Sequence, residues 1–391
     1  MVPNGWLNTS IDDNISFSGG AQPPREVFKF EPEDGYIRLI QIRDYKTDKF
    51  VTYVPEKLAK KFCTVDDVMI GRYGPPIFQI LRGIEGAYNV ALIKAIPKDG
   101  VDKEFMYYFL KRDPLLRVIE SYSQRTSGQT GIEMDVLKAY PMHLPPIPEQ
   151  RKIAKILSTW DKAITTTEKL IETSKQQKKA LTQQLLTGKK RFKDQNGYAF
   201  PEWTYESIGK YLVPYKELVS VNTDIPVLTS SRTGLYIQER SVINEGDYGV
   251  LPLGYFTYRH MSDDLVFKFN VNRTWNRGAV SKEYPVFKAV GLDSCFLESQ
   301  LNEGSDFKRF AIQQKQGGTR TRLYFKNLKE LKLNLPCLAE QEKIASVLTA
   351  SNRDIKLLEA KLTHFKQEKK ALMQQLLTGK RRVKVDEMEV A

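Results

Sequence analysis

The chain has 391 residues, more than one ordinary domain contains and consistent with about two to four domains. No apolar run approaches the roughly 18 residues that a membrane-spanning helix needs, and we expect no signal peptide, because the first ten residues lack a basic and then apolar segment. The three cysteines share no metal-ligand spacing, so we expect no metal site and a reduced, cytoplasmic protein. The net charge of +13 favours a polyanionic partner.

Residues 1–143 form the first predicted domain, which is of mixed α/β type. A polar loop at residues 123–131 (SQRTSGQTG) lies near its end. Short segments rich in β-branched and aromatic residues predict strands, and helical patterns follow them. The strands are expected at residues 36–42, 51–54, 68–73, 77–81 and 88–96, and two short helices at residues 102–111 and 114–122.

Residues 144–191 predict one long helix. Prolines at positions 145, 146 and 148 place its start near Glu149, and Gly188 with the basic residues after it marks the end. Apolar side chains recur at alternating steps of three and four, which is typical of a coiled-coil seam. The predicted seam of this helix contains Ile153, Leu157, Trp160, Ile164, Ile171, Leu181 and Leu185.

Residues 192–334 form a second predicted domain with the same plan. Its opening, with Trp203 followed by Ile208, repeats the opening with Trp6 followed by Ile11. A Gly-rich basic loop at residues 315–322 (KQGGTRTR) stands where the polar loop stands in the first domain. Strands are expected at residues 225–228, 248–253, 265–269 and 286–290, and short helices at residues 294–301 and 306–314.

Residues 335–382 repeat the long helix, and residues 383–391 are a tail. An offset of 191 residues aligns the two helices without a gap from Glu149 to Arg191, with roughly half of the positions identical, which indicates an internal duplication. The seam of the second copy contains Ile344, Leu348, Ile355, Leu358, Leu362, Phe365, Leu372 and Leu376.

Most of the excess positive charge lies on these two helices. Residues 149–191 carry a net charge of +7 and residues 340–382 a net charge of +5. A Lys-rich helix is more often a solvated face than a binding surface, so charge alone does not locate a nucleic-acid interface. We expect the helices to pair antiparallel within the chain, giving an α+β fold with two mixed domains and internal pseudo-two-fold symmetry. Divergent domains in that arrangement favour two different half-sites on one DNA duplex.

The chain resembles the specificity (S) subunit of a type I restriction–modification enzyme over essentially its whole length. The resemblance is carried by the two proline–EQ–helix–QQLLTG repeats, the Trp-containing openings and the two polar Gly loops. Further matching segments are residues 35–42 (GYIRLIQI) with Asp44, residues 67–74 (DVMIGRYG) and residues 89–94 (NVALIK). It implies two target recognition domains, each reading a few base pairs of double-stranded DNA.

The resemblance also implies partners. Two modification (M) subunits, which bind S-adenosylmethionine and methylate adenine N6, would dock on the helices, and restriction (R) subunits would add ATP-driven translocation and cleavage. We therefore expect this chain to bind no cofactor itself, with S-adenosylmethionine, ATP and Mg on the partner subunits.

The sequence contains no catalytic constellation that we identify. The segment Gly74-Pro75-Pro76 lacks the asparagine of an amino-methyltransferase motif, and the two Thr-Gly-Lys segments lack the upstream glycine of a phosphate loop. The histidines are scattered along the chain. The sequence therefore predicts a non-catalytic DNA-recognition subunit.

Candidate DNA contacts are polar residues that the predicted scaffold does not need. Arg can bind guanine with two hydrogen bonds and Gln or Asn can bind adenine in the same way, while loop residues reach phosphates. In the first domain the candidates are Arg72, Tyr73, Asn89, Arg125, Thr126, Ser127 and Gln129. In the second they are Tyr258, Arg259, His260, Arg273, Arg277, Lys315, Gln316, Arg320 and Arg322.

Two alternatives remain open from the sequence. One is a stand-alone DNA-modifying enzyme with chemistry that the motifs do not reveal. The other is a coiled-coil adaptor whose globular domains bind proteins. Steep salt dependence of duplex binding, together with sequence preference, would distinguish a DNA reader from the adaptor.

Overall fold

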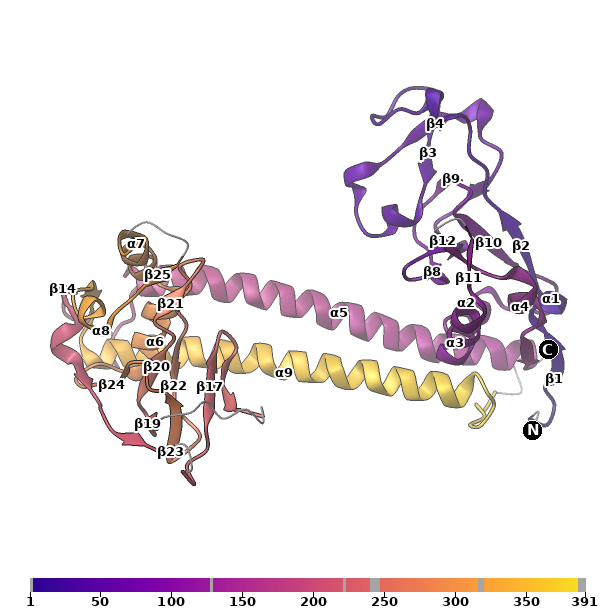
Figure 1. Ribbon diagram of the computed structural model, residues 1–391. Coiled ribbons are helices and arrows are strands. Elements are labelled where there is room, and N and C mark those ends of the chain that lie inside the picture. Colours follow the sequence, from indigo (N-terminus) through magenta and orange to yellow (C-terminus); the bar gives the residue numbers. More distant parts are fainter. Residues whose placement is uncertain (1–2, 127–128, 221–222, 240–246, 316–319, 386–391) are drawn as a thin grey trace. The chain divides into compact units, whose positions relative to one another are not determined.

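The computed structural model describes residues 3–126, 129–220, 223–239, 247–315 and 320–385. The chain divides into two compact units (Figure 1). Unit 1 comprises Met1–Thr167 with Lys361–Ala391, and unit 2 comprises Glu168–Ala360. Each unit therefore contains one mixed domain and part of each long helix.

Unit 1 combines small, mostly antiparallel sheets with short helices. Its helices are α1 (Ile11–Asn14), α2 (Lys103–Leu110), α3 (Asp113–Tyr122) and α4 (Met134–Ala139). Its described strands pair as β1 (Leu7–Ser10) with β13 (Pro141–Leu144); β2 (Ile15–Gly19), β10 (Leu92–Pro97), β6 (Val68–Gly71) and β8 (Gln79–Leu81) in that order; β4 (Tyr53–Pro55), β3 (Tyr36–Ile40), β9 (Gly86–Tyr88) and β5 (Phe62–Cys63); and β11 (Gln124–Thr126), β12 (Gln129–Gly131) and β7 (Tyr73–Gly74).

Unit 2 repeats the closing strand pair, the pair of helices and a four-stranded sheet. Its helices are α6 (Ser294–Glu303), α7 (Ser305–Gln313) and α8 (Phe325–Leu328). Its described strands pair as β14 (Thr204–Ser207) with β26 (Lys332–Leu335); β15 (Leu212–Pro214), β24 (Val286–Ala289), β20 (Phe256–Tyr258) and β22 (Phe269–Val271) in that order; β16 (Leu218–Val219), β19 (Tyr248–Pro252) and β23 (Arg277–Ser281); β17 (Leu228–Ser231) with β18 (Gly234–Ile237); and β21 (Met261–Ser262) with β25 (Thr321–Arg322).

The two long helices are α5 (Ile147–Leu186) and α9 (Leu338–Leu376). Both end as the sequence predicts. Gly188 and Gly379 have φ angles of +69° and +68°, a left-handed conformation that glycine adopts without strain and that closes many helices. Each helix starts about two residues before its Glu-Gln pair, so the predicted starts are close to the observed ones.

The helices pair antiparallel. In unit 1, Ile153 of α5 shares a buried cluster with Leu376 of α9, and seven residues later Trp160 packs edge-on against Phe365, with ring centroids 5.5 Å apart. In unit 2, Lys175 forms a 2.6 Å ion pair with Glu359. Partners on α9 thus lie earlier in the sequence as α5 advances. The predicted α+β class with paired antiparallel helices is confirmed.

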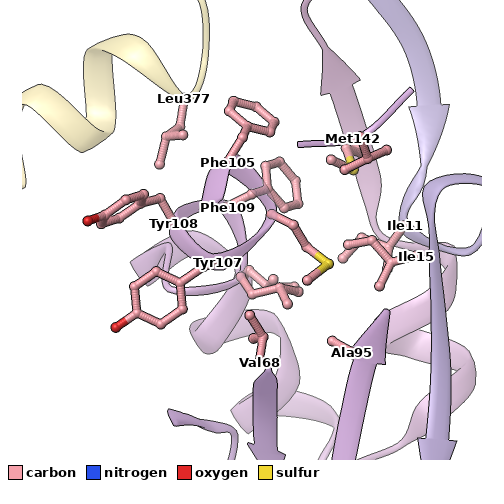
Figure 2. Close-up of a cluster of buried hydrophobic side chains, with 14 of the residues drawn as sticks. Ile11, Ile15, Val68, Ala95, Phe105, Tyr107, Tyr108, Phe109, Met142 and Leu377 are labelled. Carbon is pink, nitrogen blue, oxygen red and sulfur yellow. The ribbon is translucent and has the colours of Figure 1, made fainter. Parts of the chain in front are cut away.

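The core of each unit joins its domain to both long helices. In unit 1, aromatic side chains of α2 point into a cluster that Figure 2 shows, with Phe105 and Phe109 between Met142 of β13 and Leu377, just beyond the end of α9. In unit 2, Phe296 of α6 belongs to the cluster that contains Leu185 of α5 and Leu348 of α9. Burial of these faces stabilises the docking of each domain on the helices.

The Glu-Gln pairs explain much of the duplication. Glu149 is buried and accepts hydrogen bonds from Trp6 Nε1 (3.0 Å) and from Arg382 (2.7 Å from both Nε and Nη2). In unit 2, buried Glu340 accepts the same bonds from Trp203 (3.0 Å) and Arg191 (3.2 and 3.0 Å). Each acid thus joins the start of one helix to the segment after the other helix and to the start of the domain.

The glutamines that follow these acids, Gln150 and Gln341, also join each long helix to its domain. Gln150 Oε1 accepts from the backbone N–H of Asp102 (2.7 Å), just before α2, and Gln341 Oε1 accepts from Asp293 (2.9 Å), just before α6. Both amides are buried. They satisfy backbone donors that would otherwise be buried without partners.

Several predicted elements differ from the structure. The segment predicted as a polar loop at residues 123–131 contains β11 and β12, which pair antiparallel. The strand predicted at residues 225–228 is displaced to β17, and the one at residues 265–269 to β22, because Leu265 has a φ of +63° and cannot lie in an extended strand. Strands β20 and β23 were not predicted.

Candidate nucleic-acid interface

In unit 1, strand pairing brings separate predicted residues together. Strand β7, which contains Tyr73, pairs with β12, so that Tyr73 lies opposite Gly131 and the β11–β12 pair lies next to Arg72. The Arg72 guanidinium lies over the Tyr73 ring, 5.4 Å from its centroid, and both side chains are half-buried. The backbones of Arg125, Thr126 and Gln129 belong to β11 and β12. Ser127 lies outside the described residues.

Asn89 is a correction to the predicted contact set. It is only 7 % exposed, and its carboxamide oxygen accepts a hydrogen bond from the backbone N–H of Ala91 at 3.1 Å. This bond shapes the turn between β9 and β10, an ordinary role for asparagine. The side chain is therefore committed to the fold of the domain.

In unit 2, a polar cavity of about 510 Å³ gathers two of the predicted arginines. Arg259, which follows β20, and Arg320, which precedes β25, both line it. Pairing of β21 with β25 brings these two segments together, with Met261 opposite Arg322. Arg259 is exposed and has no hydrogen-bond or carboxylate partner among the described residues. Its guanidinium is thus available to a ligand.

The β17–β18 hairpin forms another wall of this cavity. It contributes hydroxyl side chains and a further arginine, and Lys268 adds another positive charge. The lining residues of the hairpin include Thr229, Ser230, Arg232, Thr233 and Tyr236. The strand predicted at residues 225–228 ends before these residues. The run TSSRTG, small and polar with one arginine before a glycine turn, is the signal that could have revealed them.

Two exposed ion pairs border the cavity. Arg320 Nε lies 3.0 Å from Asp263, and Arg232 lies 2.7 Å from Asp264. A hydrogen bond from Ser262 (2.9 Å) and the Arg232 pair lower the pKa of Asp264. Exposed ion pairs contribute little to stability, so these arginines can exchange a carboxylate for a phosphate or a base at small cost.

Tyr258 is a second correction. Its side chain is fully buried, its ring packs 4.6 Å from that of Phe269, and its hydroxyl donates to the backbone carbonyl of Leu323 at 3.1 Å. It belongs to the core of unit 2 and cannot reach DNA. His260 is half-buried and stacks near Tyr324, and burial lowers the pKa of its imidazole.

The remaining predicted residues of unit 2 that the structure describes lie on its surface. Arg273 pairs with Glu298 at 2.6 Å, and Arg277 pairs with Glu217. Lys315 and Arg322 are exposed. Gln316 lies outside the described residues.

The predicted helix seams contain buried side chains at both ends and near the middle of the helices. The buried seam residues are Ile153, Leu157, Ile171, Leu185, Ile344, Leu348, Ile355 and Leu376. The half-buried ones are Trp160, Ile164, Leu181, Leu358, Leu362, Phe365 and Leu372. Within the described residues, no helix is long and apolar enough to cross a membrane, and no group of three or more His, Cys, Asp or Glu side chains is placed to hold a metal ion.

Comparison with known proteins now assigns the chain to a family. The family model of the type I restriction modification DNA specificity domain matches residues 3–176 and 294–367, more than half of the chain and parts of both repeats. The chain belongs to this family. The predicted resemblance and the predicted role as a DNA specificity subunit, rather than as an enzyme, are confirmed.

Individual relatives agree with this assignment. The type I restriction enzyme MjaVIII specificity subunit of Methanocaldococcus jannaschii is 24% identical over 430 residues, which cover 98% of this chain and 94% of the relative. The solved type I S subunit from M. genitalium has a TM-score of 0.60 at 14% identity, covering 96% of this chain and 99% of that one. A chain from a solved type I R-M system has a TM-score of 0.55 at 13% identity, covering 96% and 98%. These two structures establish the similarity of fold.

Proposed function

We propose that this specificity subunit reads a bipartite, asymmetric DNA site, with one recognition domain for each half-site. The proposed domains are residues 1–143 and 192–334, the proposed spacer helices are residues 144–191 and 335–382, and residues 383–391 form a tail. The observation that carries the proposal is the duplication. The Trp–Glu–Arg and Gln–backbone bonds are the same in both units, whereas the exposed polar surfaces differ.

The second domain would read DNA through the cavity of unit 2. Arg259, with no carboxylate partner among the described residues, is suited to grip a guanine with two hydrogen bonds. Arg320 and Lys268 are suited to phosphates, and the hydroxyls of β17 to either base edges or phosphates. Asp263, which also lines the cavity, can accept a hydrogen bond from a cytosine amino group when Arg320 binds a phosphate instead of this carboxylate.

The first domain would read its half-site through the sheet of β7, β11 and β12. Arg72 and Tyr73 would meet DNA beside Arg125, Thr126 and Gln129. Asn89 and Tyr258 are removed from the proposed set of DNA contacts because they are buried. The other members of the set are Ser127, His260, Arg273, Arg277, Lys315, Gln316 and Arg322.

The helices would dock the catalytic partners. In this proposal two M subunits bind on α5 and α9, carry S-adenosylmethionine and methylate adenine N6, while R subunits bring ATP, Mg and DNA cleavage. This chain would hold no cofactor and would work in the cytoplasm with its partners. The structural neighbour from a study of type I complex assembly supports the expectation of a multisubunit complex.

The test is to express the chain with its M subunit in a host without other adenine methylation and to sequence the methylated genome. We expect one motif made of two unlike half-sites and a non-specific spacer. Exchanging residues 1–143 for the domain of a relative should change one half-site and leave the other. A single continuous motif, or a swap that changes both halves, would contradict independent reading by two domains.

A further inference from the structure

Unit 1 contains a second cavity, of about 450 Å³, away from the β7–β11–β12 sheet. It is lined by the turn between α2 and α3 and by the C-terminal part of α9. Lys111, Arg112 and Arg117 line it from the side of α2 and α3, and Lys366, Lys369 and Lys370 from α9. The three lysines of α9 are spaced three and four residues apart and so project from one face of the helix.

The charge of this cavity is strongly unbalanced. Its lining contains seven Lys and Arg side chains against the one carboxylate of Asp113. Asp113 pairs with Lys370 at 2.7 Å, and Lys369 pairs with Asp161 at 2.5 Å. Among the described residues, Arg112, Arg117 and Lys380 have no carboxylate within ion-pair distance. Arg112, Arg117 and Lys380 therefore converge on one hollow without a carboxylate partner among the described residues.

Arg112 is the most informative of these side chains. It is half-buried, and burial lowers the pKa of its guanidinium. Its guanidinium lies over the Phe109 ring, 5.0 Å from the ring centroid, and the face of an aromatic ring attracts a cation. Removing a guanidinium from water without a carboxylate is costly, and an anion bound beside it would offset that cost.

The corresponding place in unit 2 is neutralised within the chain. Asp102 caps α2 by accepting from Phe105 N–H at 2.9 Å, and Asp293 caps α6 by accepting from Phe296 N–H at 2.8 Å. The same offset of 191 residues that relates the long helices therefore relates α2 to α6.

By this offset Arg112 corresponds to Glu303, and Lys369 corresponds to Lys178. In unit 2, Glu303 forms an ion pair with Lys178 at 3.0 Å. Unit 1 has a guanidinium in place of this acid, and Lys369 pairs instead with Asp161 of α5 at 2.5 Å. The two units therefore differ in the side that the mixed domain presents to the lysine, which is an acid in unit 2 and the positively charged Arg112 in unit 1.

We propose that the basic cavity of unit 1 binds a small polyphosphate anion, that is, a molecule with two or three linked phosphate groups. Its volume falls in the range of about 300–1,000 Å³ that small-ligand sites occupy. Arg112 and Arg117 on one wall and the α9 lysines on the other can bind separate phosphate groups with charge-assisted hydrogen bonds. Pro114 and Met373 give the cavity an apolar part that could contact a nucleoside. A concave site of this size suits a small anion better than a duplex backbone.

The test titrates the full-length chain with inorganic tripolyphosphate by calorimetry, and then with ATP and with adenosine. We expect saturable binding of one tripolyphosphate per chain, binding of ATP at least as tight, and none of adenosine. If ATP binds much more tightly than tripolyphosphate, the ligand is a nucleotide, and if the affinities are equal, it is the phosphate chain alone. Adenosine binding as tightly as ATP, or no saturable binding of either anion, would overturn the proposal.

Three charge reversals make the test specific. Arg112→Glu recreates the acid that unit 2 has at Glu303, and we expect it to pair with Lys369 and to weaken tripolyphosphate binding by at least about tenfold. Arg117→Glu, on the exposed surface of α3, should weaken it similarly and does not depend on a buried substitution. Lys189→Glu is the control, since Lys189 corresponds to Lys380 by the offset of 191, is exposed and lies outside the cavity.

Equal weakening by all three variants would mean that tripolyphosphate binding depends only on the net charge of the chain, and would overturn the site.

The last experiment uses a short non-specific duplex as a competitor. If the duplex displaces tripolyphosphate, and Arg112→Glu weakens the duplex as much as it weakens the anion, the cavity holds a DNA phosphate and the proposal for a small anion fails. Binding of cognate DNA by Arg112→Glu within about twofold of the wild type would separate this site from the proposed DNA-reading surfaces.

Discussion

At the residue scale, one buried acid in each unit joins three distant segments. In unit 1 this acid is Glu149, whose side chain is 4 % exposed, with Arg382 as its charged partner. Arg382→Ala would leave the carboxylate buried with Trp6 as its remaining side-chain donor. We expect a loss of unfolding free energy of about 3 kcal/mol, because an unpaired buried charge is strongly destabilising.

Thermal and chemical unfolding of the purified chain measure this loss. Arg381→Ala is the control, because Arg381 is an exposed neighbour with the same charge. If both variants lose the same unfolding free energy, the guanidinium of Arg382 does not stabilise the buried Glu149 carboxylate.

Asp67 makes the stability of unit 1 sensitive to acid. Burial would raise the pKa of this carboxyl, but hydrogen bonds from Lys94, the Thr64 N–H and Lys103 outweigh it and hold the pKa well below the ordinary value. Such a group stabilises the fold at pH values above its unfolded pKa of about 3.9 and loses that contribution as the pH falls toward the folded pKa.

We therefore expect Asp67→Asn to melt below the wild type at about pH 6 and the difference to shrink toward about pH 3. Melting curves at several pH values check the sign. A difference that stays constant over this range would mean that the ionisation of Asp67 is not linked to folding.

Arg259 and Arg320 should act differently on DNA. Arg320→Ala should leave the melting temperature unchanged, because its pair with Asp263 is exposed, while weakening all duplexes alike and lowering the salt slope by about one. Arg259→Ala should cost roughly 1–3 kcal/mol on the cognate site and relax the preference at one position.

Binding at two salt concentrations, on matched and mismatched duplexes, separates the phosphate role from the base role. A lower melting temperature with unchanged relative preference would assign either arginine a structural role instead.

At the element scale, the middle of the paired helices offers a matched comparison. Leu358 is half-buried on the predicted seam, and the neighbouring Leu357 is 59 % exposed. Leu358→Asp should place a carboxylate against α5 and lower the melting temperature. Adding Leu362→Asp should enlarge the loss of unfolding free energy to several kcal/mol in total. Leu357→Asp should have little effect.

Unfolding curves and co-purification with the M subunit report the outcome. Equal losses from Leu357→Asp and Leu358→Asp would show that the seam is not where the periodicity places it.

At the scale of the whole molecule, the helices are the proposed ruler between the half-sites. Inserting one heptad into α5 between Lys175 and Lys179, and one into α9 near Glu359, keeps the seam in register. Each helix lengthens by about 10 Å, or about three base pairs of duplex. The methylated motif should keep both half-sites and gain a longer spacer. An unchanged spacer would mean that something other than the helices fixes the distance.

The sequence by itself determined the duplication, the two long helices, their glycine ends and the α+β class. These features depend on local signals, since a helix seam repeats every few residues and a left-handed glycine closes a helix where it stands. The sequence also indicated that the two domains differ in their polar Gly loops and in their exposed arginines. The sequence predicted the positions of short strands less accurately, as the displaced β17 and β22 illustrate. Pairing with distant strands decides where a short strand forms.

The tertiary structure alone decided which polar residues are free to act. Asn89 and Tyr258 are indistinguishable from surface contacts in the sequence, yet both are buried and hydrogen-bonded to the backbone. Each cavity likewise joins residues far apart in the chain: the hairpin at Arg232 with Arg320 in unit 2, and Arg112 with Lys369 in unit 1. The physical reason is that burial and charge balance are set by everything that packs around a side chain, and most of those neighbours are remote in sequence.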